Sequence, residues 1–216
     1  MTDGQELRVV VSADTAPHCR IVILASGAGS LAQAVLDAST EPGHCYRAAA
    51  LVSDRDCEAV ARASRAGLDT AVVKPADHAH RAAWDRALTD VVRGFDPDWV
   101  VSAGFMRILG PVFLDEFDGR VVNTHPALLP AFPGAHAVRD ALAYGVTVTG
   151  CTVHLVDAGV DTGPVIAQRA VDVRYDDTEA TLHERIKVVE RELLVDVLAA
   201  AAGGRLRIEG RKVHVS

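Results

Sequence analysis

The chain alternates short apolar runs with segments of helical periodicity, and this alternation limits the possible folds more than any other feature. The apolar runs lie at 20–24, 46–52, 70–73 and 99–102, and the helical patterns between them cover about 31–41, 56–66 and 80–93. Continuous apolar runs of this kind are typical of strands buried on both faces of a sheet. Repeated strand–helix units predict an α/β fold with a mostly parallel central sheet, right-handed crossovers and helices on both faces.

The later part of the chain departs from this alternation. Residues 149–156 and 164–173 are extended segments with no helix between them. Strands joined by a short loop pair antiparallel, so we expect an antiparallel strand toward the C-terminal part of the sheet. A helix is expected near 135–144, before the first of these segments.

A long helix is predicted at about 178–202, where apolar residues recur at helical spacing. Asp176 and Glu179 resemble a capping box at its start. The tail at 203–216 is expected to form a small terminal hairpin.

The composition fits a single folded domain. A length of 216 residues with 49% hydrophobic content allows a full core without disulfides. We expect one domain over residues 18–216, preceded by an N-terminal extension, residues 1–17, to which the sequence assigns no role.

Charge and cysteine usage narrow the classes of partner. The net charge of −7 argues against a nucleic-acid or membrane partner, although local cations and backbone amides still allow an anionic small ligand. No stretch approaches a membrane span, and the N-terminus lacks a signal-peptide pattern. The four cysteines show no C-x-x-C spacing, which indicates a reduced, cytoplasmic protein. The oligomeric state stays open, with a homodimer as the commonest soluble assembly.

A glycine-rich loop at 25–30 follows the first apolar run. Glycines let the backbone approach a phosphate, and the next helix supplies amides and the positive end of its dipole. The loop lacks the third glycine of the dinucleotide fingerprint and the lysine of the P-loop. It favours a site for a single phosphate monoester, with a tight turn that binds no ligand as the alternative.

A second loop, 104–109, follows the strand at 99–102. Ligands of open α/β sheets bind at the carboxyl ends of strands, where this loop is expected to lie. Its mixture of apolar and polar residues suits a slot for a flat ring. The alternative is a packing loop whose Arg107 is simply solvated.

Polar residues at two further strand ends carry the chemistry. Asn123 and His125 lie two apart on an extended strand, so both side chains face the same side, and Asp161 lies in a turn-rich loop after another apolar run. An amide that stabilises an oxyanion, an imidazole that moves a proton and a carboxylate that supports the imidazolium are the parts of an acyl-transfer site. Each of these residues alone has a structural explanation. Asn123 and Asp161 suit turns, and a histidine near a strand end is often held by hydrogen bonds for structural reasons. The combination predicts an active site.

Four segments in order carry a resemblance to a known family. They are Ser-Gly-Ala-Gly-Ser at 26–30, Ala-Gly-Phe-Met-Arg-Ile-Leu at 103–109, Asn-Thr-His-Pro-Ala-Leu-Leu-Pro-Ala-Phe-Pro-Gly-Ala-His at 123–136 and Val-Asp-Ala-Gly-Val-Asp-Thr-Gly-Pro-Val-Ile at 156–166. They resemble the motifs of phosphoribosylglycinamide formyltransferases, which are folate-dependent enzymes of purine synthesis. The resemblance runs from about residue 20 to 200. It implies a single-domain Rossmann-like formyltransferase fold.

The resemblance also implies an activity. The chain would transfer the formyl group of 10-formyltetrahydrofolate, its co-substrate, to the glycine amine of 5-phosphoribosylglycinamide, with no metal required. The residues that match catalytic positions of the family are Asn123, His125 and Asp161. The expected substrate-binding residues are Gly29, Ser30, Leu31, Lys187 and Glu190. The expected folate-binding residues are Arg81, Met106, Arg107, Ile108, Leu109 and His154.

The glycine loop departs from the family pattern. The family commonly has Ser-Gly-Asn-Gly-Ser-Asn, whereas this chain has Ala28 and Leu31 at the asparagine positions. Side-chain contacts at these two positions are therefore lost, while the backbone amides of residues 29–31 remain.

Other functions share parts of the pattern. A formyltetrahydrofolate deformylase has the same catalytic residues but an additional N-terminal domain, for which 17 residues are too short. A methionyl-tRNA formyltransferase has an additional C-terminal nucleic-acid domain. In a metal-dependent hydrolase the ligands would be His125, His136, His154 and Asp161, but their spacing matches no standard ligand pattern. A non-catalytic nucleotide-binding module would not need the paired polar strand ends.

Overall fold

The computed structural model describes residues 19–216, and the predicted N-terminal extension at 1–17 lies outside this part of the chain. A seven-stranded sheet has the strand order β3-β2-β1-β4-β5-β6-β7. Its strands are β1 (Cys19–Leu24), β2 (Tyr46–Ser53), β3 (Asp69–Val72), β4 (Trp99–Ser102), β5 (Val121–His125), β6 (Val148–Leu155) and β7 (Val165–Asp172). The first five strands run parallel, and β6 and β7 pair antiparallel. The predicted α/β class and the antiparallel C-terminal strands are both confirmed.

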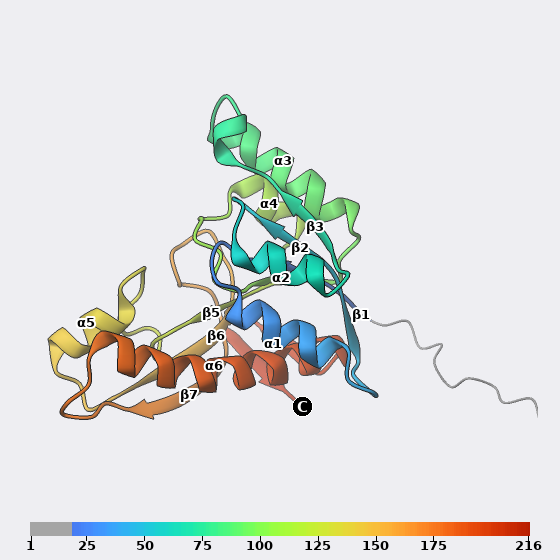
Figure 1. Ribbon diagram of the computed structural model, residues 1–216. Helices are drawn as coiled ribbons and strands as arrows, with labels where there is room; N and C mark the ends of the chain where they lie inside the picture. The colour runs from blue at the N-terminus through green and yellow to red at the C-terminus, as the bar shows by residue number, and fades with distance from the viewer. Residues whose placement is uncertain (1–18) are drawn as a thin grey trace, which may run out of the picture.

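Helices cover both faces of this sheet (Figure 1). The helices are α1 (Ser30–Ser39), α2 (Glu58–Arg65), α3 (Arg81–Gly94), α4 (Pro111–Glu116), α5 (Ala137–Tyr144) and α6 (Glu179–Ala202), and a short 3-10 helix spans Pro75–Asp77. Apolar residues of α1, α2 and α6 share one buried cluster with the sheet. Those of α3 and α4 form the cluster on the opposite face. Two cores of this kind explain why the apolar run 21–24 of β1 is buried on both faces.

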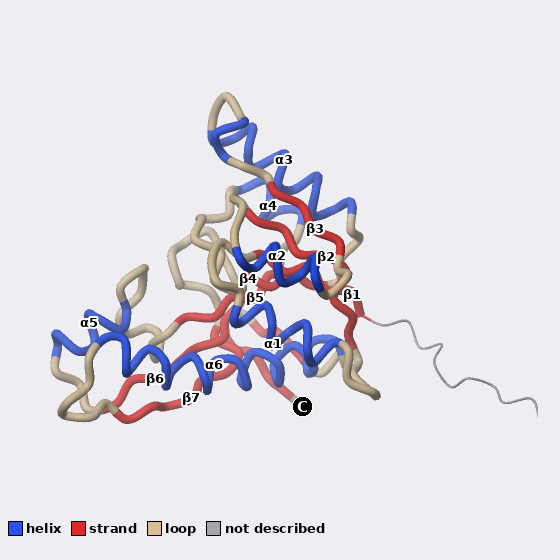
Figure 2. Tube along the Cα trace, in the orientation of Figure 1, coloured by secondary structure: helices blue, strands red, loops and turns tan. Residues whose placement is uncertain are grey.

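The C-terminal part of the sheet is covered by the long helix. In Figure 2 the strands β6 and β7 run beside α6, with α5 at the same end of the molecule. The last residues form the predicted hairpin, β8 (Leu206–Glu209) and β9 (Lys212–Val215), as a separate two-stranded sheet. Among residues 19–216, no helix is both long and apolar enough to span a membrane.

The predicted capping box of α6 is wrong. Thr178 is the N-cap, and its side chain accepts a hydrogen bond from the Thr181 amide while the Thr181 hydroxyl accepts one from the Thr178 amide. Asp177, just before this N-cap, accepts hydrogen bonds from the Thr181 hydroxyl at 3.0 Å and from Arg185. The N-cap therefore lies two residues after Asp176, while the helix itself covers the predicted range.

Candidate active site

A cavity of about 530 Å³ lies at the carboxyl ends of β1, β4 and β5. The sheet order changes direction between β1 and β4, because the chain adds β2 and β3 on one side of β1 and β4 onward on the other. Such a switch point leaves a crevice between diverging connections, where α/β proteins bind ligands. Three predicted segments line the cavity: the glycine loop, the 104–109 loop and the end of β5.

The glycine loop forms the start of α1. Gly29 is the N-cap residue with a φ of 76°, a left-handed conformation that favours glycine. A Cβ at this position would lie 2.7 Å from the Cα of Ala59 on α2. Glycine is thus required both by the turn and by the close approach of α2, and the amides of the first helical turn are left facing the cavity.

β5 places Asn123 and His125 on the same side of the sheet, as their spacing predicts. His125 is buried, with its Nε2 2.8 Å from the Phe132 carbonyl oxygen and its Nδ1 3.3 Å from Asp161 Oδ2. Carbonyl and carboxylate oxygens can only accept hydrogen bonds. Both ring nitrogens are therefore satisfied together when the imidazole carries two protons.

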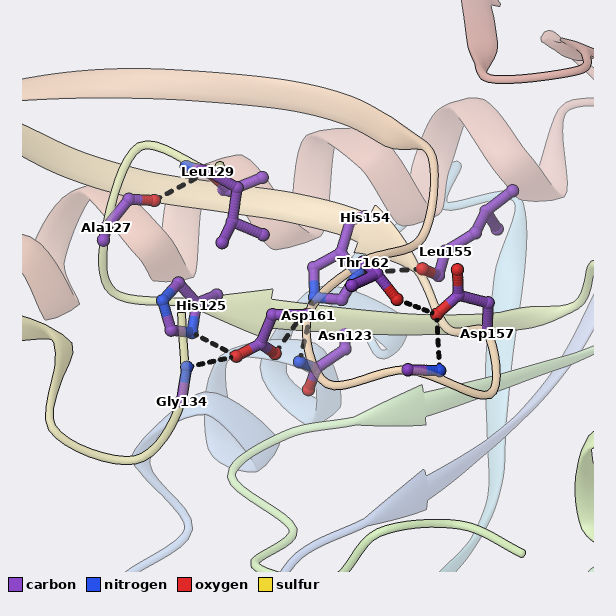
Figure 3. A network of polar contacts seen from close by, with 12 residues as sticks. Asn123, His125, Ala127, Leu129, Gly134, His154, Leu155, Asp157, Asp161 and Thr162 are labelled. Atoms are coloured by element: carbon purple, nitrogen blue, oxygen red, sulfur yellow. Dashed lines mark hydrogen bonds and ion pairs between the residues drawn. The ribbon is translucent and has the colours of Figure 1, made fainter. Parts of the chain in front are cut away.

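Asp161 reaches His125 from the loop between β6 and β7 (Figure 3). Its Oδ2 also accepts a hydrogen bond from the Gly134 amide at 2.8 Å. Its φ of 54° is left-handed, which is uncommon for a residue with a side chain and is tolerated best by aspartate and asparagine. The carboxylate is held from two sides in the position where it meets the imidazole. The gap in sequence between the two residues is closed by the fold.

Further hydrogen bonds hold the loop between β6 and β7, which carries Asp161. Asp157 Oδ1 accepts hydrogen bonds from the Gly159 amide at 3.0 Å and from the Thr162 hydroxyl at 2.6 Å. Arg211, in the hairpin β8–β9, donates to the Thr162 carbonyl at 2.9 Å. These contacts make the loop a defined structure next to the cavity.

Asn123 is oriented by His154, which is opposite it on β6. His154 Nδ1 lies 2.8 Å from the Leu155 carbonyl oxygen, so this nitrogen carries the proton. Nε2 of the neutral ring then accepts from Asn123 Nδ2 at 3.1 Å. Burial lowers the pKa of His154, although its hydrogen bond to Leu155 and the charge of Asp161 act in the opposite direction. A neutral His154 thus turns the amide nitrogen of Asn123 toward the centre of the group (Figure 3).

The face of α6 at the cavity carries His183, Lys187 and Glu190. Burial raises the pKa of Glu190, against a hydrogen bond from Thr124 and the charge of Lys187. Burial, and next to it the charge of Lys187, lowers the pKa of His183. His183 was not predicted from the sequence. Its spacing of four and seven residues from the two predicted residues is the signal that would have found it.

The second loop brings apolar side chains to the cavity. Met106 is 72% and Ile108 62% exposed, which is unusual for residues of this type, and Leu109 is buried beneath them. Arg107 lines the cavity as well, with its Nε 2.7 Å from Asp54 Oδ2. Surfaces of this kind suit a flat apolar ring.

Arg81 is placed differently from the other predicted folate-binding residues, because it is not among the residues that line the cavity. Its guanidinium stacks on Trp84, 4.8 Å from the ring centroid, and donates a hydrogen bond to the Ile108 carbonyl. Arg81 therefore contacts the backbone of the second loop from outside.

Within the predicted loops the lining also includes residues that were given no individual role, namely Phe105, Val156, Asp157, Gly159 and Val160, and His183 lies outside those loops. Most of them are neighbours of predicted residues in the same loops. The four side chains considered as metal ligands do not form a metal site: within residues 19–216, no group of three or more His, Cys, Asp or Glu side chains is arranged to hold an ion. His136 is exposed at the start of α5, away from the cavity lining.

Comparisons with known proteins agree with this geometry. Residues 19–198 match the family described as formyl transferase. Phosphoribosylglycinamide formyltransferase of Mycobacterium tuberculosis is 54% identical, over 98% of this chain and 99% of the relative. The crystal structure of glycinamide ribonucleotide transformylase 1 from Symbiobacterium toebii superposes with a TM-score of 0.90 at 44% identity, covering 92% of this chain and 94% of that one. A formyltetrahydrofolate deformylase from Pseudomonas syringae has a TM-score of 0.85 at 26% identity, covering 93% of this chain and 66% of that one.

Proposed function

The chain belongs to the formyl transferase family, and we propose that it transfers the formyl group of 10-formyltetrahydrofolate to the glycine amine of 5-phosphoribosylglycinamide, in purine biosynthesis. The observation that carries this proposal is the convergence of Asn123, His125 and Asp161 on a cavity that also reaches the start of α1. One end supplies groups for acyl transfer, and the other supplies amides for a phosphate. We place the reaction in the cytoplasm, where free cysteines such as these four stay reduced.

In the proposed mechanism the neutral amine attacks the formyl carbon, and the carbonyl oxygen becomes an oxyanion. The amide N–H of Asn123 donates a hydrogen bond to this oxygen, and the positive charge of a protonated His125 stabilises it, since both ring nitrogens already face the Phe132 carbonyl and Asp161. Asp161 stabilises the imidazolium through the Nδ1 contact. A proton leaves the attacking amine and reaches the folate nitrogen as the C–N bond breaks, relayed by a water that Asp161 orders. No metal takes part in any step.

The ribonucleotide is proposed to bind along the glycine loop and α6. The amides of Gly29, Ser30 and Leu31 at the start of α1 receive the phosphate, and Lys187 adds a positive charge. Glu190 is buried at the same wall, where a protonated carboxyl can donate to the substrate and an ionised one can accept from it. The ring of the folate lies over Met106, Ile108 and Leu109, beside Arg107 and His154.

The test of the function is a balance of products. Purified protein incubated with both substrates should give formylated ribonucleotide and tetrahydrofolate in equal amounts, with no free formate. The likeness to a deformylase makes hydrolysis the second candidate. Release of formate at an equal rate without the ribonucleotide would establish a deformylase and reject the transferase.

Gly29→Ala should damage the phosphate end selectively. The added methyl group meets Ala59, and alanine is strained at a φ of 76°, so the start of α1 must shift. We expect the KM for the ribonucleotide to rise about tenfold or more, the equivalent of about 1.4 kcal/mol. Gly27→Ala is the matched control in the same loop, because a Cβ there meets nothing within 4 Å. Equal KM values for the two variants in steady-state kinetics would contradict this role of the loop.

Lys187→Gln should weaken binding of the ribonucleotide more than it slows the chemistry. Lys187 lines the cavity, and its 2.8 Å pairing with Glu184 is an exposed contact within one helix, of a kind that contributes little and that a phosphate can replace. A charge that binds the substrate equally strongly in the ground state and in the transition state contributes to affinity alone. Its loss raises KM and leaves kcat nearly unchanged. We expect about a tenfold rise in KM. Lys212→Gln, an exposed lysine on β9, serves as the control, and a similar KM in both variants would remove Lys187 from the site.

A further inference from the structure

A buried carboxylate lies next to the cavity and takes no part in the proposed chemistry. Asp54 directly follows β2, and its side chain is 0% exposed. A buried ionised group is costly unless charged and hydrogen-bonding partners compensate for its lost hydration. The partners of Asp54 therefore indicate what this carboxylate does.

Two arginines and one hydroxyl surround Asp54. Arg107 Nε is 2.7 Å and Arg55 Nη2 2.8 Å from its Oδ2. Burial alone would raise the pKa of Asp54, but hydrogen bonds from Arg55, Ser26 and Arg107 outweigh it and lower the pKa to about 2. The carboxylate is ionised at any physiological pH. It is a fixed negative charge between two positive ones.

These partners come from different sides of the cavity. Ser26 belongs to the glycine loop, and Arg107 belongs to the loop proposed to hold the folate ring. Ser26 also joins the two loops directly: its hydroxyl oxygen accepts from the Met106 amide at 2.9 Å, and its own amide donates to the Gly104 carbonyl at 3.2 Å. The same hydroxyl helps to lower the pKa of Asp54. The carboxylate, the hydroxyl and the guanidinium form one chain of contacts across both loops.

We propose that Asp54 is a positioning residue that sets the two substrate-binding loops in register, so that both substrates lose affinity when its charge is removed. The proposal rests on the proposed function for the identity of the two substrates. The charge of Asp54 holds Arg107 against the end of β2. It also orients the hydroxyl hydrogen of Ser26 toward Asp54, so that a lone pair of the hydroxyl oxygen accepts from the Met106 amide. Without the charge, Arg107 and Arg55 repel each other and the second loop loses its fixed distance from the first.

The diagnostic variant is Asp54→Asn, which keeps the size of the side chain and removes the charge. We expect the KM of the ribonucleotide and that of the formyl-folate to rise together, each by about three- to tenfold, because small misplacements in a pre-organised site are expensive. Arg107→Gln should raise mainly the folate KM, since Arg107 belongs to one loop. In the double variant the folate KM should rise by less than the product of the two single effects, because both changes break the same contact.

Asp56→Asn is the matched control. Asp56 lies two residues further on, is 76% exposed and pairs with Lys74 at 2.6 Å, away from the cavity lining. Both of its KM values should equal those of the unchanged protein. Thermal unfolding of all variants shows whether a raised KM reflects loss of the fold or a change in the relative position of the two loops.

The outcomes are distinct. A joint rise of both KM values in folded Asp54→Asn supports the proposal. A lower melting temperature with both KM values within twofold of the unchanged protein overturns it, and so does a rise confined to one substrate. If Asp54→Asn is not recovered folded, Ser26→Ala breaks the same chain of contacts and must give the joint rise. Failure of the unchanged protein to formylate the ribonucleotide would reject the proposed function instead, before any variant is compared.

Discussion

Replacement of His125 by alanine is expected to lower kcat by about 10²–10³-fold, the loss typical of one oxyanion donor, and by more if the proton relay is also broken. The reason is the position of the ring. Both nitrogens face oxygen acceptors at 2.8 and 3.3 Å, and the proposed mechanism uses the ring protonated on both nitrogens to stabilise the oxyanion. The measurement is steady-state turnover at saturating concentrations of both substrates.

Loss of the fold must be separated from loss of the chemistry. His125 is buried at 3% exposure, so alanine leaves a small cavity and removes a hydrogen bond to Phe132. Circular dichroism and thermal unfolding should show a folded protein with a lowered melting temperature. His136→Ala, an exposed histidine of the same segment, should retain full turnover. Near-normal turnover of folded His125→Ala would exclude the proposed role.

The central fold follows from local patterns in the sequence. The five parallel strands and the three longer helices between them, α1, α2 and α3, are marked by apolar runs and helical spacing, because their side chains must pack on both faces of one sheet. The short helix Pro111–Glu116 was missed, since six residues are too few to establish a helical period. The start of α6 was predicted to within a residue, but its capping residues were not, because Asp176 and Thr178 are both good capping residues.

The candidate site could be predicted only as a set of residue types. The sequence indicated which side chains lie at strand ends, and the spacing of Asn123 and His125 placed them on one side. The approach of Asp161 could not be derived, because it depends on the antiparallel pairing of β5 with β6 and on the Gly134 contact. Asp54 was missed for the same reason: Arg107 is 53 residues away, and no local pattern pairs them.

Substitution of Asp161 by asparagine is the second change with a large expected effect, because it removes the charge and little else. Asparagine tolerates the left-handed φ of 54°, and its amide oxygen can still accept from the Gly134 amide. The imidazolium of His125 then faces a neutral group at 3.3 Å. We expect kcat to fall by about 10²–10⁴-fold, as for the loss of the carboxylate partner of a catalytic histidine elsewhere. Thermal unfolding should change little.

Asp157→Asn provides the comparison within the same loop. Asp157 holds the loop through Gly159 and Thr162 but does not touch the imidazole, so its loss should reduce kcat by less than about tenfold. Asp161→Ala should be worse than Asp161→Asn in stability as well as in turnover, since alanine lacks the hydrogen bond and is strained at this φ. If Asp161→Asn and Asp157→Asn lower kcat equally, the carboxylate of Asp161 acts by shaping the loop. A loss confined to Asp161→Asn shows that its charge acts on His125, since the two variants share the loop and differ only in contact with the ring.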